Sequence, residues 1–196
     1  MITIVESGGA NIASIQCALA RLGVNAELSR DPNTIRQSSH VILPGVGSAG
    51  NAMQQLQKNS LVDVIPALTQ PVLGICLGMQ LLFDFSAEND SECLGIIPGK
   101  INKLTSKHEK LIVPHMGWNT LTILERNRLL KNIPIHSYSY FVHSYAASIG
   151  KFTCASTFYG ENFSAVVQKN NFYGTQFHPE KSSVVGSIIL KNFLEL

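Results

Sequence analysis

Hydrophobic and polar positions in the first half of the chain alternate between two periods. Four short segments have the pattern of strands: residues 2–5 (ITIV), 26–29 (AELS), 40–43 (HVIL) and 72–75 (VLGI). After the first of these, apolar residues recur at helical spacing from Ile12 to Leu22, with Asn11 as a cap and Gly23 as the stop. Strands that alternate with helices indicate an α/β fold with parallel strands.

Further helices are predicted by their start signals and periodicity. Asp31-Pro32 is a sound helix start, and helical patterns cover residues 48–69 and 77–85. A final amphipathic helix is predicted over residues 182–196, where one face would gather Val184, Val185, Ile188 and Ile189.

The pattern changes after about residue 93 to short strand-like pieces joined by turn residues such as Asn170-Asn171. The parallel sheet should therefore carry antiparallel additions. A length of 196 residues with 45% apolar content fills one ordinary core. We expect a single domain over residues 1–196.

Charge and composition exclude several classes of partner. The net charge is +2 without a long run of like charges, so we expect neither nucleic acid nor a membrane as partner. The start of the chain has no basic region followed by a long apolar one, and we expect a cytoplasmic protein. Its scattered cysteines predict no disulfide and no zinc. The remaining histidines show no metal spacing and are interpreted as structural or interface residues: His40, His108, His115, His136 and His143.

The sharpest junction in the sequence is Gly74-Ile75-Cys76-Leu77-Gly78, where an apolar strand runs directly into a helical pattern. A nucleophile between glycines is typical of a sharp strand-to-helix turn that exposes the central side chain. The helix that begins at Leu77 would supply N–H groups and a positive dipole end beside the thiol. The alternative is a buried apolar cysteine, which is our interpretation of the other three.

A second constellation is His178-Pro179-Glu180. Proline disfavours helix at the preceding residue, so an extended segment would project positions 178 and 180 to the same side. Glu180 could then orient the imidazole, and His178 could take the proton of a thiol and return one to a leaving group. A strand end with a solvated histidine and glutamate is the alternative.

The segments GICLGMQ and QFHPEKS together resemble the two signatures of class I glutamine amidotransferases, whose triad would be Cys76, His178 and Glu180. Within that family LPGVGSA, PHMGWN and YFVHSY are similar to the glutaminase subunits of imidazole glycerol phosphate synthase, and the match covers almost the whole chain. The resemblance implies a three-layer, flavodoxin-like fold with a mixed, largely parallel central sheet and antiparallel additions.

The activity implied by this resemblance is hydrolysis of glutamine to glutamate without a cofactor or a metal. Ammonia would pass to a (β/α)8-barrel cyclase subunit in a heterodimer. The cyclase would form imidazole glycerol phosphate and an aminoimidazole carboxamide ribotide, a step in histidine biosynthesis. Direct transfer is expected because ammonia released into water would be protonated and diluted.

The resemblance also implies roles for individual residues. The oxyanion hole would combine the N–H of Leu77 with the loop Val46-Gly47, whose flanking glycines allow the intervening peptide to rotate. Residues expected to hold glutamine are Gly45, Gln80, Glu88, Ser144 and Tyr145. Residues expected to face the cyclase are Asn11, Trp118 and Lys181. Taken alone, each of these has a plainer interpretation as a turn, a helix surface or a core residue.

Other functions stay open at this point. A paralogous glutaminase could supply ammonia to a different synthase, for example in sugar amination. A flavodoxin-like hydrolase could also carry an elbow cysteine. The segment SGGAN could instead be a phosphate-binding turn of a non-enzymatic nucleotide-binding module, although no G-x-G-x-x-G or Walker pattern accompanies it.

Overall fold

A mixed sheet forms the centre of the molecule. The computed structural model describes residues 1–6, 12–45, 47–105 and 111–196. Within these residues eight strands pair in the order β2-β1-β3-β4-β14-β13-β12-β9. Their bounds are β1 (Ile2–Val5), β2 (Ala26–Ser29), β3 (His40–Leu43), β4 (Val72–Ile75), β9 (Thr122–Ile123), β12 (Thr153–Tyr159), β13 (Glu161–Lys169) and β14 (Phe172–Thr175). The pairs from β2 to β14 are parallel and those from β14 to β9 antiparallel, as the sequence predicted.

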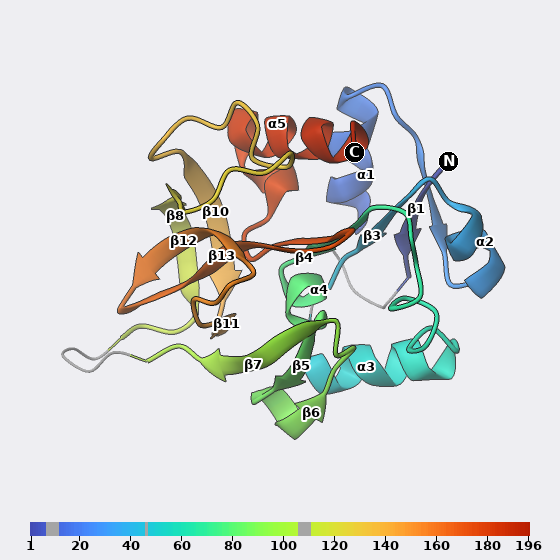
Figure 1. Cartoon of the computed structure of the whole chain (residues 1–196), viewed down its shortest axis with the longest axis horizontal. Helices are drawn as coiled ribbons and strands as arrows, with labels where there is room; N and C mark the ends of the chain where they lie inside the picture. Colours follow the sequence, from blue (N-terminus) through green and yellow to red (C-terminus); the bar gives the residue numbers. More distant parts are fainter. Residues whose placement is uncertain (7–11, 46, 106–110) are drawn as a thin grey trace.

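Helices and a second sheet cover the two faces of this central sheet (Figure 1). On one side lie α1 (Ile12–Arg21) and α5 (Ser183–Leu194). On the other lie α3 (Ala49–Lys58), α4 (Leu77–Gln80) and the sheet β11-β7-β5-β6. The bounds of that sheet are β5 (Phe83–Ser86), β6 (Ser91–Glu92), β7 (Ile97–Lys103) and β11 (Tyr145–Ala147). This arrangement confirms the three-layer α/β fold.

Three shorter features complete the chain. The strands β8 (His115–Thr120) and β10 (Tyr138–His143) pair antiparallel as a separate ribbon. Helix α2 (Pro32–Gln37) begins at Asp31, whose carboxylate accepts the N–H of Thr34 at 2.8 Å, so the predicted start is confirmed. The 3-10 turns η1 (Glu88–Asp90) and η2 (Pro179–Lys181) lie next to the site described below.

The central strands are buried on both faces, which explains why they are continuous apolar runs rather than alternating ones. Ile42 of β3 packs in the core beneath α1 and α5, whereas Val41 and Leu43 pack in the core shared with α3 and β5. The parallel centre of the sheet is therefore held between two hydrophobic layers.

The helix predicted over residues 77–85 is wrong beyond Gln80. Helix α4 lasts a single turn, and Phe83–Ser86 is strand β5, paired with β6 and β7. Leu81, Leu82 and Phe83 are each fully buried, so their apolar run does not distinguish a helix from a strand. Likewise α3 ends at Lys58, well before the predicted residue 69.

Helix α5 buries a face that overlaps the predicted one: Ile189 is fully buried, and Val185 and Ile188 are partly buried against the core. Its buried face carries Gly186, Ile189, Leu190 and Phe193, whereas Val184 is 69% exposed. A Cβ on Gly186 would lie 1.8 Å from the carbonyl oxygen of Pro179. Because this close contact needs glycine, Gly186 fixes which face of α5 turns inward.

No helix in the described ranges has the length and hydrophobicity needed to cross a membrane. Among those same residues, no cluster of three or more His, Cys, Asp or Glu side chains could hold a metal ion.

Candidate active site

Cys76 sits at a strained turn between β4 and α4. Its φ is 54° and its ψ −110°, a conformation that costs a non-glycine residue about 1–3 kcal/mol. The N–H of Cys76 donates to the carbonyl of Thr175 at 2.8 Å, which ties the turn to β14. A Cβ on Gly78 would lie 1.8 Å from the carbonyl oxygen of Leu43, so α4 packs against the end of β3 only because residue 78 is glycine.

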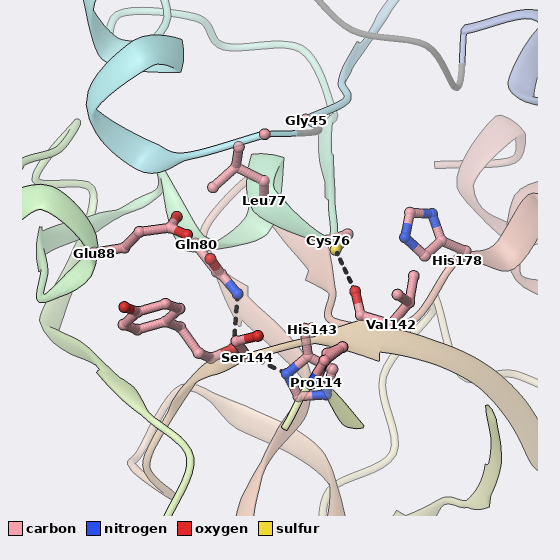
Figure 2. A pocket seen from close by; sticks show the side chains of 12 residues that line it. Gly45, Cys76, Leu77, Gln80, Glu88, Pro114, Val142, His143, Ser144 and His178 are labelled. Carbon is pink, nitrogen blue, oxygen red and sulfur yellow. Dashed lines mark hydrogen bonds between the residues drawn. The ribbon is translucent and has the colours of Figure 1, made fainter. Parts of the chain in front are cut away.

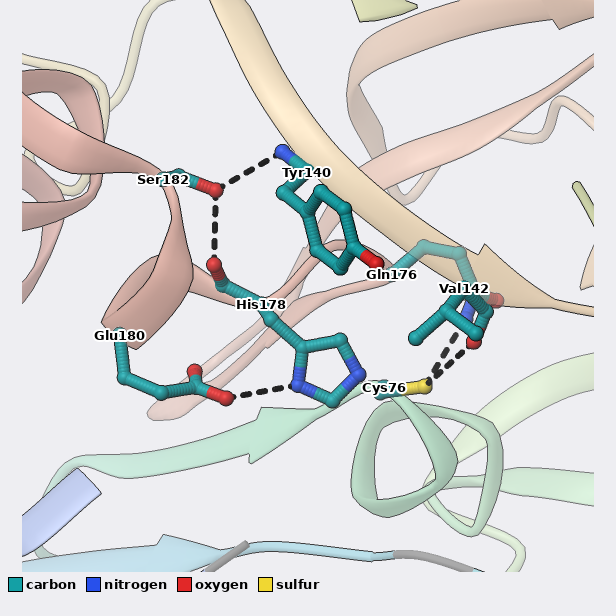
Figure 3. A network of polar contacts seen from close by, with 7 residues as sticks. All are labelled: Cys76, Tyr140, Val142, Gln176, His178, Glu180 and Ser182. Atoms are coloured by element: carbon teal, nitrogen blue, oxygen red, sulfur yellow. Dashed lines mark hydrogen bonds and ion pairs between the residues drawn. The ribbon is translucent and has the colours of Figure 1, made fainter. Parts of the chain in front are cut away.

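The topology of the sheet brings His178 to this turn. Strands β4 and β14 are parallel neighbours in which Thr175 pairs with Ile75. The chain leaves both strands at the same edge of the sheet, so the residues that follow Ile75 and Thr175 meet there. Figure 3 shows His178 between Glu180 and Cys76, with a different ring nitrogen facing each of them.

The His178 ring is held by Glu180. The ring Nδ1 lies 2.7 Å from Oε1 of Glu180, and both side chains are buried. His178 itself is extended, as predicted, with a φ of −95° and a ψ of 98°, but residues 179–181 form the 3-10 turn η2 instead of continuing the extended segment. Proline at the first position of the turn fixes φ without losing a hydrogen bond, so a tight turn suits this sequence as well as an extended one does.

A hydrogen-bond network fixes the turn η2 against β10. Ser182 Oγ donates to the carbonyl of His178 at 2.7 Å and accepts the N–H of Tyr140 at 2.9 Å (Figure 3). The N–H of His178 donates to the Tyr140 carbonyl at 3.0 Å. The backbone beneath the imidazole is therefore anchored on two sides.

The surroundings of His178 favour its charged form. Burial lowers the pKa of His178, but hydrogen bonds to Cys76 and Glu180 and the negative charge on those groups raise it to about 10. The raised pKa makes His178 a base strong enough to accept the proton of a neighbouring thiol, which a cysteine nucleophile requires.

A cavity of about 340 Å³ opens beside Cys76 (Figure 2). It gathers most of the residues that the sequence nominated from distant segments: Gly45, Gly47, Cys76, Leu77, Gln80, Glu88, Ser144, Tyr145 and His178. Val46 and Asn11, expected in the oxyanion hole and at the interface, lie outside the described residues. The structure brings the other expected pocket residues together around the thiol.

Two polar side chains of the cavity are held by backbone groups. The amide nitrogen of Gln80 donates to the carbonyl of Tyr145 at 2.8 Å. Oε2 of Glu88 accepts the N–H of Ala49, the first residue of α3, at 2.9 Å. Both side chains are therefore oriented before any ligand enters.

Gly45 lies directly over the start of α4. A Cβ on Gly45 would approach both Cβ of Leu77 and the backbone nitrogen of Gly78 at 2.7 Å. Gly47 has a φ of +90°, which side chains rarely adopt. The N–H of Leu77 is at the first position of α4, where helices have no internal acceptor for it.

The structure also adds residues that the sequence interpretation missed. Sγ of Cys76 lies 3.7 Å from the carbonyl oxygen of Val142 and 3.8 Å from the amide nitrogen of Gln176, both within hydrogen-bonding distance for sulfur. Gln176 is fully buried, and its own Oε1 accepts from Gln80 at 3.0 Å. It belongs to the segment QFHPEKS, so the motif contained the signal. His143 and Pro114 also line the cavity.

A second cavity, of about 570 Å³, is lined in part by Glu180. Its lining includes Trp118, Lys181, Val184 and Ile188. Trp118 is 52% exposed, so it is not the core tryptophan that was the alternative. The expected interface residues Trp118 and Lys181 thus lie on one surface that reaches Glu180.

Comparison with known proteins gives consistent results. A family model described as glutamine amidotransferase class-I matches residues 3–196. Imidazole glycerol phosphate synthase subunit HisH 2 of Legionella pneumophila (strain Philadelphia 1) is 50% identical over 196 residues, with 100% of this chain and 98% of that protein covered. Subunit HisH of Escherichia coli (strain K12) is 48% identical, with 100% and 99% covered.

Solved structures share the fold at lower identity. A structure described as a glutamine amidotransferase superposes with a TM-score of 0.75 at 16% identity, covering 99% of this chain and 97% of that one. The structure of PurLQS from Thermotoga maritima gives a TM-score of 0.68 at 17% identity, again covering 99% and 97%.

Proposed function

The chain belongs to the class I glutamine amidotransferase family, and on that premise we propose that it is the glutaminase subunit of an imidazole glycerol phosphate synthase. It hydrolyses the side-chain amide of glutamine. The assignment of the site rests on the buried arrangement of Cys76, His178 and Glu180. The strained turn at Cys76 places its thiol beside the imidazole of His178, and the carboxylate of Glu180 holds that imidazole.

The reaction follows from these positions. His178 takes the proton of Cys76, and the thiolate attacks the carboxamide carbon of glutamine. The N–H of Leu77, together with the loop of Val46 and Gly47, would stabilise the oxyanion of the tetrahedral intermediate. Collapse breaks the C–N bond, and His178 returns its proton to the leaving nitrogen as ammonia. Water, deprotonated by His178, then hydrolyses the γ-glutamyl thioester to glutamate.

The opposite end of the cavity suits the amino-acid end of the substrate. We assign the carboxylate of Glu88 to the α-ammonium group, because the charges are complementary and Glu88 lines the cavity. Gln80, Ser144, Tyr145 and Gly45 complete the binding wall in this proposal. These residues belong to different segments of the chain and come together only when it folds.

The relatives are named as subunits of a synthase, so the chain is expected to act with a partner. We propose that the partner is a (β/α)8-barrel cyclase in a heterodimer, contacted by Trp118 and Lys181 and by Asn11. The cavity lined by Trp118 supports this placement, since it adjoins Glu180. Ammonia would then reach the cyclase without entering bulk water.

Two further parts of the proposal concern the whole chain. A single domain over residues 1–196 is supported by the family match to residues 3–196. A cytoplasmic location agrees with the state of the four cysteines, all of them described and all free thiols.

The test is a glutaminase assay with and without the cyclase subunit, on the wild type and on Cys76→Ser. We expect the serine variant to lose glutamine hydrolysis and to resist labelling by a diazo-ketone glutamine analogue, while it still assembles with the cyclase. Wild-type hydrolysis should rise when the cyclase is added. Labelling that persists in Cys76→Ser would refute the nucleophile, and hydrolysis indifferent to the cyclase would favour a different synthase partner.

A further inference from the structure

A buried chain of hydrogen bonds runs from the cavity wall into the β8–β10 ribbon. Nδ1 of His143 lies 2.9 Å from the carbonyl oxygen of Tyr145. Nε2 of His143 lies 3.1 Å from Nδ1 of His115, and Nε2 of His115 lies 3.2 Å from the amide nitrogen of Asn119. Both histidines are almost fully buried, with 3% of His115 and 5% of His143 exposed.

Only one arrangement of protons satisfies every contact in this chain. A carbonyl cannot donate, so Nδ1 of His143 must carry hydrogen toward Tyr145. If that ring is neutral, its Nε2 is an acceptor and Nδ1 of His115 must donate to it. Nε2 of His115 is then the acceptor for the amide of Asn119. Each ring therefore carries its proton on Nδ1, and a second proton on either ring would face another donor.

Aromatic neighbours hold the His115 ring in this orientation. The ring stacks on Tyr159 with centroids 4.1 Å apart and on Phe141 with centroids 5.0 Å apart. A stacked ring between two aromatic faces has little freedom to rotate out of plane. The direction of its two nitrogens is thus set by packing as well as by hydrogen bonds.

The other end of the chain reaches the reacting sulfur. The carbonyl of Tyr145 accepts from His143 and also from the amide nitrogen of Gln80. Gln80 in turn donates to Oε1 of Gln176, whose amide nitrogen lies 3.8 Å from Sγ of Cys76. With both lone pairs occupied, the Tyr145 carbonyl is a fixed point between the histidines and the wall of the cavity.

His143 lines the cavity, yet it is unsuited to acid or base work. Burial lowers the pKa of His143 to about 3 and that of His115 to about 4, so both rings are neutral at pH 7. The ring nitrogens of His143 already face Tyr145 and His115. Of the two histidines that line this cavity, His178 is the one left to exchange a proton with substrate.

We propose that His143 and His115 are positioning residues of the glutaminase reaction, which fix the Tyr145 carbonyl and, through it, the amides of Gln80 and Gln176 around glutamine and Cys76. This inference rests on the proposed function, since it names further residues that the same site needs.

Imidazole ¹⁵N spectra of the wild-type complex with the cyclase test the proton arrangement directly. We expect His115 and His143 to be neutral Nδ1–H tautomers at pH 7, the less common form in free histidine. Assignment uses His115→Phe, which keeps a stacked ring, and His143→Asn. An Nε2–H tautomer or a charged ring at either position overturns the proposal without any reference to catalysis.

Kinetics on the same complex separate positioning from folding. His143→Leu removes the donor to Tyr145 and should raise the KM for glutamine or lower kcat so that kcat/KM falls roughly tenfold, the effect of one buried hydrogen bond. His143→Asn places an amide N–H near the position of Nδ1 and should recover most of that loss. The control His136→Asn changes an exposed turn residue with a φ of 62°, which asparagine tolerates.

The outcomes distinguish this proposal from the function on which it rests. If the wild type is not labelled at Cys76 by the diazo-ketone analogue, the proposed function fails. If the wild type is labelled and His143→Leu keeps the wild-type kcat/KM, the positioning role fails alone. Equal losses in His143→Leu and His143→Asn, with unchanged melting temperatures, would also overturn it, because the restored donor would then have no effect.

Discussion

At the residue scale, the proposed active site holds histidines whose pKa values are shifted in opposite directions. The pKa of His178 is raised to about 10, because the hydrogen bonds and charges of Cys76 and Glu180 outweigh the effect of burial, whereas burial keeps His115 and His143 neutral. Histidines of the same fold thus perform separate tasks, set by their neighbours.

The neutral histidines predict how stability depends on pH. In the unfolded chain both titrate near 6.5, but in the folded chain His115 titrates near 4 and His143 near 3. Between these values the unfolded state binds more protons, so the free energy of unfolding should fall as pH drops from 6.5 toward 4. The slope contributed is at most about 1.4 kcal/mol per pH unit for each histidine.

Urea unfolding at several pH values between 7.5 and 4.5 measures this slope. The wild type should lose more stability over that range than His115→Phe does, because the variant lacks one of the two histidines. Carboxylates titrate equally in both proteins and cancel in the comparison. If the unfolding free energies of the two proteins changed by the same amount between pH 7.5 and 4.5, the prediction would be contradicted.

The residues recovered from sequence are those with a local signature. A cysteine between glycines at Cys76, and the segment His178-Pro179-Glu180, each indicate a chemical role from a few neighbouring positions. Gln176 lies within the QFHPEKS motif, but its contact with Gln80, like that of His143 with His115, joins separate elements. Such roles are set by the packing of distant strands, which no local pattern encodes.

At the element scale, two glycines let helices approach the catalytic segments more closely than any side chain would allow. Gly78 places α4 against the end of β3, and Gly186 places α5 against the turn η2. Cys76 and Glu180, the proposed nucleophile and the carboxylate of the proposed triad, each lie next to one of these contacts. Sequence periodicity located both helices but not these contacts, and it extended α4 into β5 because consecutive apolar residues fit either structure.

Gly186→Ala should therefore disturb both folding and catalysis. The added Cβ would lie 1.8 Å from the Pro179 carbonyl, so η2 must move and carry Glu180 with it. We expect a loss of about 1–3 kcal/mol in unfolding free energy, as for overpacked cores, together with reduced glutamine hydrolysis. Chemical denaturation and a glutaminase assay measure the two effects.

Ser187→Ala is the matched control, since it adds no atoms one position further along α5. Its unfolding free energy should stay within about 0.5 kcal/mol of the wild type. If Gly186→Ala were as stable and as active as this control, the proposed packing of α5 on η2 would be wrong.

At the scale of the whole molecule, the exposed Trp118 lines a cavity that continues to Glu180 of the proposed triad. Trp118→Ala should weaken assembly with the cyclase, because large exposed aromatic residues are frequent anchors of interfaces. A loss of about 2 kcal/mol, roughly 30-fold in Kd, is the expected size. Titration calorimetry with the cyclase subunit gives the value.

Phe158→Ala provides the comparison for this experiment. Phe158 is an aromatic residue of β12 that is 63% exposed but lies outside the cavity lined by Trp118. Its removal should leave the Kd unchanged. Equal changes in Kd for the two substitutions, or no change for either, would show that Trp118 does not anchor the interface.

The pairing of β4 with β14 has a last consequence, for how such proteins diverge. The hydrogen bonds between these neighbours set the distance from thiol to imidazole, whatever the length of chain that connects them. Insertions and deletions in loops of the connecting segment that lie outside the cavity can therefore leave the spacing of Cys76 and His178 unchanged. Related proteins can thereby differ in the surface that binds a partner enzyme while the reacting residues keep the same geometry.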